Sequence, residues 1–191
     1  MLKRPPLVVI CGIPGSGKST IGAILCGLMP GAVHIETDAV RRMIAEPNYS
    51  RPESSFIYEA CVDVAQEALK RGRPVVLDGT FARADHRRSA LTRLRRSYGP
   101  MVVAYVTCKL GTAERRNASR NAVVPGHRLR RIYDYFDEPA GALKVNSDEH
   151  SAEENANLIL AAISRQQHES NTQTNLRHRP VYRLQAASGG S

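Results

Sequence analysis

The segment GIPGSGKS, residues 12–19, constrains this chain more than any other part of it. It matches the spacing G-x-x-x-x-G-K-[ST] in full, directly after the apolar run LVVIC (7–11) and before a helical pattern. Glycines let the backbone bend so that its N–H groups reach phosphate oxygens, and the N-terminus of the following helix favours anions. The segment therefore predicts a loop that binds a nucleoside triphosphate. The expected contacts come from Gly12, Pro14, Gly15, Ser16, Gly17, Lys18, Ser19 and Thr20.

Two side chains of this loop have distinct expected tasks. Lys18 should reach the β- and γ-phosphates, and the Ser19 hydroxyl should be a ligand of Mg²⁺. Guanine-specific proteins carry an [NT]KxD element that binds the base, and this chain has no such tetrapeptide. We therefore expect ATP and Mg²⁺ as the cofactors.

Short apolar runs and helical patterns alternate along the chain. The runs cover 7–11, 32–35, 74–78, 101–108 and 143–146; helical patterns cover 21–28, 50–72, 84–97, 112–120 and 151–165. This alternation predicts an α/β fold with a parallel sheet and helices on both faces. After residue 165 polar residues dominate, so we expect one domain over 1–165 and a disordered tail over 166–191.

Composition and charge exclude some classes of protein and leave others open. With 42% hydrophobic and 24% charged residues, the chain is neither disordered nor fibrous. No signal peptide and no apolar run of about 18 residues is visible, so no membrane span and a cytoplasmic location are expected. Four widely spaced cysteines without a CxxC pair predict reduced core residues. The net charge of +9 indicates either a polyanionic partner or an arginine-rich genome, and both interpretations stay open.

Four landmarks within residues 7–164 resemble those of compact P-loop kinases. These kinases are related to polynucleotide kinase, adenylylsulfate kinase, gluconate kinase, chloramphenicol phosphotransferase and zeta-type toxins. The landmarks are the loop itself, Thr37-Asp38 with Arg41, the segment LDGT (77–80), and ERRNASR (114–120). The resemblance implies a three-layer P-loop kinase fold with a five-stranded parallel sheet and a helical lid around 113–136.

The resemblance also implies roles for the acceptor-side residues. Asp38 would accept the proton of the acceptor hydroxyl, and Arg41 would bind the acceptor or its phosphate. Asp78 would help to place Mg²⁺ or organise the acceptor, together with Thr80. Structural alternatives remain, since an aspartate at position 38 is also a good helix N-cap and Asp78 could only form a turn.

Arginines in the expected lid and in the helix after 83 are the candidate anion ligands. Arg116 and Arg120, spaced i,i+4, would neutralise the transition state, and Arg116 would also contact ATP, unless both lie on a solvated helix face. Arg83 is the candidate for an anionic acceptor. Further candidates for ATP or acceptor contacts, or for a solvated helix, are His127, Arg128, Arg130 and Arg131. Tyr133, Tyr135 and Phe136 are expected to pack the lid against the core, and 146–148 to border the adenine.

Three functions are consistent with these residues. The leading prediction is a kinase that transfers the γ-phosphoryl group of ATP to a hydroxyl of a small-molecule metabolite or antibiotic. A polynucleotide 5'-hydroxyl kinase, which would make nucleic acid the partner, is the alternative favoured by the net charge. A non-catalytic ATP-sensing protein is the alternative from another class, although such a protein needs no acceptor-side base such as Asp38.

Overall fold

The computed structural model describes residues 4–44, 50–119 and 124–177, and side chains as far as residue 169. Five strands form one sheet: β1 (Leu7–Cys11), β2 (Val33–Glu36), β3 (Val75–Asp78), β4 (Met101–Thr107) and β5 (Leu143–Asn146). They run parallel in the order β2-β3-β1-β4-β5. The predicted five-stranded parallel sheet is confirmed, with the loop strand β1 at its centre.

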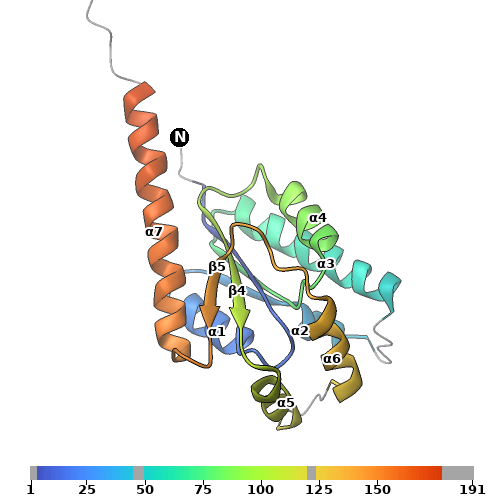
Figure 1. The fold of residues 1–191 in the computed structure, drawn as a ribbon. Coiled ribbons are helices and arrows are strands. Elements are labelled where there is room, and N and C mark those ends of the chain that lie inside the picture. Colours follow the sequence, from blue (N-terminus) through green and yellow to red (C-terminus); the bar gives the residue numbers. More distant parts are fainter. Residues whose placement is uncertain (1–3, 45–49, 120–123, 178–191) are drawn as a thin grey trace, which may run out of the picture.

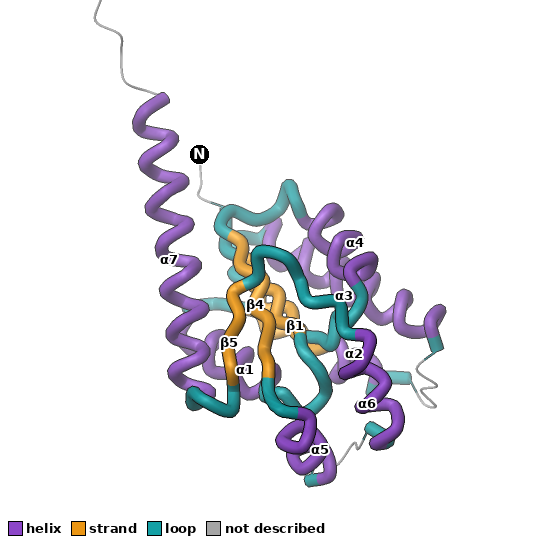
Figure 2. Tube along the Cα trace, in the orientation of Figure 1, coloured by secondary structure: helices purple, strands orange, loops and turns teal. Residues whose placement is uncertain are grey.

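Helices cover both faces of this sheet, as predicted (Figure 1). They are α1 (Lys18–Leu28), α2 (Thr37–Arg41), α3 (Arg51–Lys70), α4 (Ala84–Leu94), α5 (Leu110–Ala118), α6 (Gly126–Tyr135) and α7 (Ala152–Arg177). Figure 2 shows the strands between α1 and α7 on one side and α3 and α4 on the other, with α5 and α6 beyond one end of the strands. No helix among the described residues has the length and apolarity that crossing a membrane requires.

Strand β1 packs against both layers because its side chains alternate between the two faces. Leu7 and Val9 belong to the cluster with α3 and α4, whereas Val8 and Ile10 belong to the cluster with α1 and α7. All four are at most 1% exposed. Complete burial of each such side chain contributes about 1.5–3 kcal/mol, which explains why this strand is apolar without interruption.

Capping groups begin two helices where the sequence predicts them. The hydroxyl of Ser50 accepts a hydrogen bond from the Glu53 N–H at 3.3 Å, at the start of α3. At α7, Ser151 and Glu154 bond each other reciprocally, at 2.7 and 3.1 Å. The capping box at Ser151 is confirmed, and at Ser50 the predicted bond from the serine hydroxyl is present; both satisfy N–H groups that a helix start leaves without partners.

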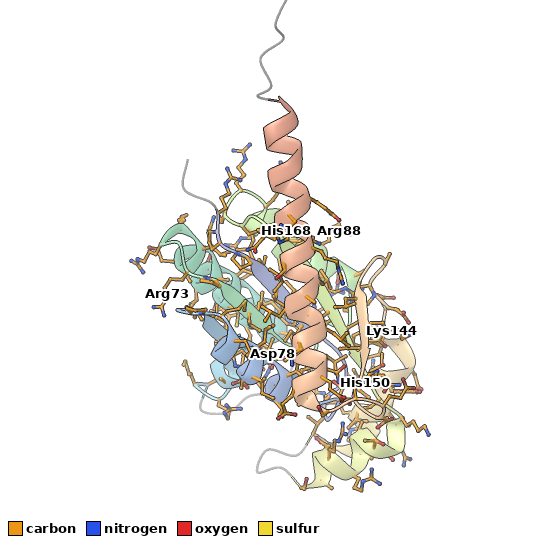
Figure 3. The ribbon with its side chains drawn as sticks, turned by 90° about the vertical axis from the view of Figure 1, so that its left-hand side faces the viewer. Arg73, Asp78, Arg88, Lys144, His150 and His168 are labelled. Carbon is orange, nitrogen blue, oxygen red and sulfur yellow. The ribbon has the colours of Figure 1, made fainter. Side chains whose placement is uncertain are left out.

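Two predicted helix boundaries differ from the structure. Helix α5 begins at Leu110 and not at Thr112, because the Asp148 carboxylate accepts a bond from the Lys109 N–H at 2.7 Å. This bond is also the main reason why the pKa of Asp148 is lowered. Helix α7 continues to Arg177, past the predicted boundary at 165, and extends beyond the sheet (Figures 1 and 3). Its added residues include no glycine or proline.

Candidate functional site

The phosphate loop lies between the end of β1 and the start of α1, with two of its glycines, Gly12 and Gly15, pressed against neighbouring backbone. A Cβ at Gly12 would lie 2.4 Å from the Val106 oxygen, and one at Gly15 would lie 2.4 Å from the Ala113 oxygen. Both residues have positive φ, +152° and +82°. Only glycine fits these positions, so β4 and α5 hold the loop in its shape.

The N-terminus of α1 is open to an anion. Gly17 is the N-cap residue in a left-handed conformation, and no side chain caps the helix. Lys18 is buried, and its Nζ donates to the Ile13 carbonyl oxygen at 2.9 Å, so the ammonium stays folded over the loop. Ser19 is half-buried in the first turn. Free N–H groups, a lysine and a hydroxyl thus surround one point, as binding of a triphosphate requires.

Asp78 is a buried carboxylate beside this loop. It ends β3, pairs in register with Ile10 of β1, and is 2% exposed. Among the described residues neither of its oxygens has a hydrogen-bond partner; Nε2 of His34 lies 3.8 Å from Oδ2. The described ranges contain no cluster of three or more His, Cys, Asp or Glu side chains that could hold a metal ion by themselves. Mg²⁺ typically uses one or two protein oxygens, waters and substrate phosphates, so Asp78 and Ser19 fit this ion.

The turn after Asp78 is strained and firmly held. Phe81 is fully buried with φ of +42°, a conformation that costs an ordinary residue about 1–3 kcal/mol. Its N–H donates to the Tyr58 hydroxyl at 3.2 Å, its ring stacks on Tyr58, and its carbonyl oxygen accepts a bond from Arg87. These contacts fix the turn and place Thr80 at the wall of a cleft.

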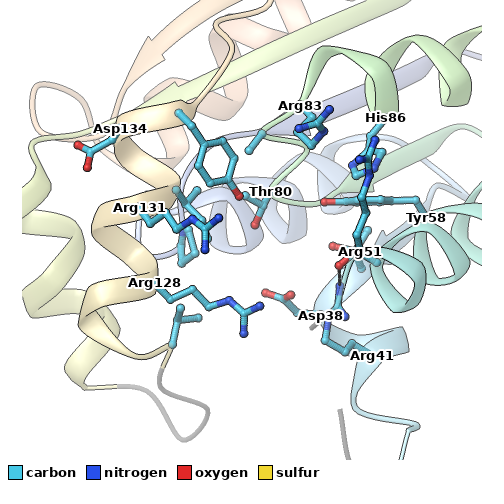
Figure 4. A pocket seen from close by; sticks show the side chains of 17 residues that line it. Asp38, Arg41, Arg51, Tyr58, Thr80, Arg83, His86, Arg128, Arg131 and Asp134 are labelled. Atoms are coloured by element: carbon cyan, nitrogen blue, oxygen red, sulfur yellow. Dashed lines mark hydrogen bonds between the residues drawn. The ribbon is translucent and has the colours of Figure 1, made fainter. Parts of the chain in front are cut away.

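This cleft of about 750 Å³ opens next to the phosphate loop. Pro14 of the loop forms part of its lining. The other lining residues with polar or aromatic side chains are Thr37, Asp38, Arg41, Arg51, Ser54, Tyr58, Thr80, Arg83, His86, Arg128, Arg131, Asp134 and Tyr135. Figure 4 shows Arg128 of α6 pointing toward the carboxylate of Asp38 of α2. The cleft is therefore a second binding space that shares a wall with the loop.

The acceptor-side residues expected from sequence lie together, and one of them, Arg41, also forms an ion pair that the sequence did not predict. Asp38, Arg41, Thr80 and Arg83 all line the cleft. Arg41, however, is buried in an ion pair with Glu53 and lies 3.4 Å from the Ser54 hydroxyl. The helix that contains Arg41 packs on the start of α3, which brings Glu53 beside it. Arg41 thus has a structural partner in addition to any ligand.

Of the two predicted lid arginines, the structure describes Arg116, which is not among the described lining residues of this cleft. Nη1 of Arg116 donates to the Ser147 hydroxyl at 2.8 Å and Nη2 to the Ser147 carbonyl oxygen at 3.0 Å. Its Nη1 would lie 3.9 Å from a Cβ on Gly17, so Arg116 borders the phosphate loop. Helix α5 ends at Ala118, and Arg120 lies outside the described residues. Ser147 belongs to the segment expected to border the adenine.

Helix α6 contributes the arginines that line the cleft. Arg128 and Arg131, one helical turn apart, are in the lining, whereas the exposed Arg130 pairs with Glu114 at 2.7 Å. The predicted packing of the lid aromatics holds for Phe136, which stacks on Tyr105, but is wrong for Tyr133 and Tyr135, which are 45% and 46% exposed. Phe136 follows the end of α6 in extended backbone, where its ring reaches Tyr105 of β4, whereas both tyrosines belong to the helix itself.

Both ends of α6 are attached to neighbouring elements. At its start, Val124 bonds the Asn117 side chain of α5; at its end, the Asp137 N–H donates to the Ala82 oxygen at 2.9 Å. The Asp137 carboxylate also accepts a bond from the Ala84 N–H at 3.1 Å and so caps α4. These bonds hold the arginines of α6 opposite α2.

Some lining residues were not proposed as acceptor ligands from sequence, and three of them have charged or aromatic side chains near Thr80. Arg51 and Tyr58 belong to α3, and His86 belongs to α4, with the Tyr58 and His86 rings 4.8 Å apart. Burial raises the pKa of Tyr58 to about 12 and lowers the pKa of His86 below 6.5. At neutral pH both rings are therefore uncharged hydrogen-bonding groups. Their only sequence signal is polarity next to the apolar stripe of each helix.

A phosphate loop at the carboxyl edge of a parallel sheet, sharing a wall with a separate cleft, is the arrangement of a kinase-like P-loop NTPase. Residues 7–139 match the family AAA_33, described as an AAA domain, and the chain belongs to this family of P-loop kinases. The family uses ATP and Mg²⁺, which agrees with the expected cofactors.

Individual relatives have low sequence identity to this chain. The chain is 24% identical over 137 residues to the L-seryl-tRNA(Sec) kinase of Methanococcus maripaludis, covering 70% of this chain and 53% of that protein. It thus spans about half the length of this curated relative. The fold is similar to a gluconokinase from Sinorhizobium meliloti (TM-score 0.67, 18% identity, 90% and 98% covered). It is also similar to the APS kinase of Mycobacterium tuberculosis (TM-score 0.69, 18% identity, 85% and 99% covered).

Proposed function

We propose that this chain transfers the γ-phosphoryl group of ATP to a hydroxyl group of a small-molecule acceptor. One observation carries the proposal: Asp38 and Pro14 of the phosphate loop line the same cleft. An acceptor in this cleft would therefore meet a carboxylate on one side and the end of the triphosphate on another. The kinase names of the relatives support the same reaction class.

The residues supply positioning and charge for this transfer. Lys18 and the α1 N-terminus hold the β- and γ-phosphates, Arg116 contacts the nucleotide, and Ser19 and Asp78 hold Mg²⁺. When bound, Mg²⁺ neutralises phosphate charge and aligns the phosphate oxygens. Arg120 is proposed as a further transition-state ligand, as its lid position implies.

Asp38 is the proposed base, and Arg41, Thr80 and Arg83 the proposed acceptor ligands. The carboxylate of Asp38 accepts the hydroxyl proton while the acceptor oxygen bonds the γ-phosphorus. The bond from that phosphorus to the bridging oxygen breaks, and ADP leaves with the electron pair. Arg128, which points toward Asp38, would neutralise charge on the phosphoryl group between them (Figure 4).

Two other functions predict different behaviour. A polynucleotide 5'-hydroxyl kinase is favoured by the arginines of the cleft and by the net charge of +9, and its acceptor binding would weaken steeply with added salt. An ATP-sensing protein would bind ATP and label no acceptor. A screen with γ-labelled ATP against oligonucleotides, hydroxylated metabolites and antibiotics distinguishes the three functions.

The Asp38→Asn variant tests the proposed base directly. It should bind ATP within about twofold of the wild type and lose about a hundredfold or more in transfer, as removal of a general base usually causes. The control is Asp63→Asn on α3, because Asp63 is 63% exposed and lies outside the cleft lining. Normal transfer by Asp38→Asn would exclude Asp38 as the base.

A further inference from the structure

The proposed acceptor cleft has far more positive than negative charge. Among its described lining residues are five arginines, namely Arg41, Arg51, Arg83, Arg128 and Arg131, but only two carboxylates, Asp38 and Asp134. Figure 4 shows the carboxylate of Asp134 pointing away from the cleft. One arginine beside Asp38 is sufficient to meet the transferred phosphoryl group, so the others require a separate explanation.

Not all of these arginines are equally available to a ligand. Arg41 is buried with Glu53, and the side chains are 8% and 9% exposed. Arg51 and Arg83 share one carboxylate, that of Asp85, with Nη2 to Oδ2 distances of 3.7 and 2.9 Å. Two cations against one anion leave an excess positive charge at this wall, and both guanidinium groups are well exposed.

Arg131 faces this wall from α6 across the cleft. It is exposed and has no hydrogen-bond or ion-pair partner among the residues that the structure describes. In Figure 4, Thr80 lies between Arg131 on one side and Arg83 and His86 on the other. Three arginines from α3, the start of α4 and α6 thus border one space.

Phosphate is the chemical group that suits this space. Guanidinium forks form paired, charge-assisted hydrogen bonds with phosphate oxygens, and no lysine lines the cleft in the described part of the chain. A neutral acceptor such as a plain sugar would leave the excess positive charge of this space uncompensated. Because His86 is neutral at pH 7, it can add a hydrogen bond without adding charge.

We propose that the acceptor carries a phosphate group of its own, and that Arg51, Arg83 and Arg131 bind it. This proposal rests on the proposed function, which supplies the transfer of a phosphoryl group to a hydroxyl of the same acceptor. It places recognition of this phosphate on arginines other than Arg41, which is paired with Glu53. The phosphate could belong to a phosphorylated metabolite or to a nucleic acid end, and the probes below separate these two sources.

Calorimetric titration of the full chain tests the proposal with the phosphate loop saturated by Mg²⁺ and AMPPNP. The probes are glycerol 3-phosphate against glycerol, and a 3'-phosphorylated dinucleotide against the same dinucleotide without that phosphate. We expect a phosphorylated probe to bind at least about tenfold more tightly than the same compound without its phosphate. This is the usual effect of one or more charge-assisted hydrogen bonds. The tighter of the two phosphorylated probes identifies the source.

Matched variants locate the phosphate. Arg131→Gln and Arg83→Gln should each weaken binding of the phosphorylated probe by about tenfold. Arg130→Gln, the next residue on α6, and Arg88→Gln on α4 remove the same charge outside the cleft and should change the affinity by less than about twofold. Equal losses in all four variants, or no preference for phosphorylated probes, would overturn the proposal.

The outcome can be separated from that of the proposed function. If neutral hydroxyl compounds are phosphorylated while phosphorylated probes show no added affinity, the kinase function stands and the phosphate subsite is wrong. If the phosphorylated probes bind through Arg83 and Arg131 but no acceptor receives label, the subsite stands and the transfer reaction is wrong.

Discussion

Asn117 of α5 forms two hydrogen bonds with the backbone of Val124: its Nδ2 donates to the carbonyl oxygen at 2.7 Å, and its Oδ1 accepts from the N–H at 3.1 Å. Asn117 is 4% exposed, so water does not replace these bonds readily. The pair joins α5, which holds the phosphate loop, to the start of α6, which lines the cleft. One side chain therefore couples the two halves of the candidate site.

The Asn117→Ala variant should lose about 1–3 kcal/mol of unfolding free energy, because it leaves backbone groups of Val124 without partners. The KM for an acceptor should rise more than the KM for ATP, since α6 lines the cleft. Urea unfolding and steady-state kinetics measure the two effects. Asn157→Ala on the exposed face of α7 is the control, and an equal loss there would contradict the assigned role.

Two glycine substitutions near the loop should have opposite effects on stability. Gly15→Ala places a methyl group 2.4 Å from the Ala113 oxygen at φ of +82°, so it should destabilise the fold and weaken ATP binding. Gly111→Ala within α5 meets open space and should stabilise the protein by up to about 1 kcal/mol through helix propensity. Thermal unfolding with and without ATP tests both. A harmless Gly15→Ala would show that the loop is not held by α5.

Asp78→Asn should separate stability from metal binding. Removing a buried charge whose oxygens have no hydrogen-bond partner in the described structure should raise the Tm of the ligand-free protein, by about 2–4 °C for each kcal/mol gained. The same change should weaken Mg²⁺-dependent nucleotide binding, measured by titration at several Mg²⁺ concentrations. Unchanged Mg²⁺ dependence would remove Asp78 from the proposed ion site.

The burial of His86 should make stability depend on pH. Burial lowers the pKa of His86 from 6.5; the nearby cations Arg83 and Arg51 act in the same direction, while Asp85 opposes them. Below pH 6.5 the unfolded chain then binds more protons than the folded chain, so stability falls as the pH drops, by at most about 1.4 kcal/mol per unit.

Urea unfolding between pH 7 and pH 5 measures this slope. His86→Gln should flatten it, whereas His127→Gln at an exposed position should not. Asp85 contributes in a lower window, because its pKa is lowered from 3.8 to about 2 by its bond with Arg83, and its stabilisation is lost only as the pH falls through that range. An unchanged slope in His86→Gln would assign the dependence to other groups.

Local patterns in the sequence determined the sheet and the phosphate loop. Strand β1 had to be buried on both faces because five consecutive apolar residues leave no polar face, and Gly12 to Ser19 follows it directly. The Ser50 cap and the box at Ser151 satisfy N–H groups within one helical turn, so they too depend only on neighbouring residues.

Tertiary structure alone decided how the residues of the cleft are paired and which helices bring them together. Arg41 lines the cleft as expected, but packing of α2 on α3 also pairs it with Glu53; the start of α5 depends on Asp148, far along the chain. Asp38 and Arg128 line the same cleft because a parallel sheet brings the carboxyl ends of its strands, and α6 beyond them, to one edge. Contacts between side chains so distant in sequence depend on packing and have no local pattern that could reveal them.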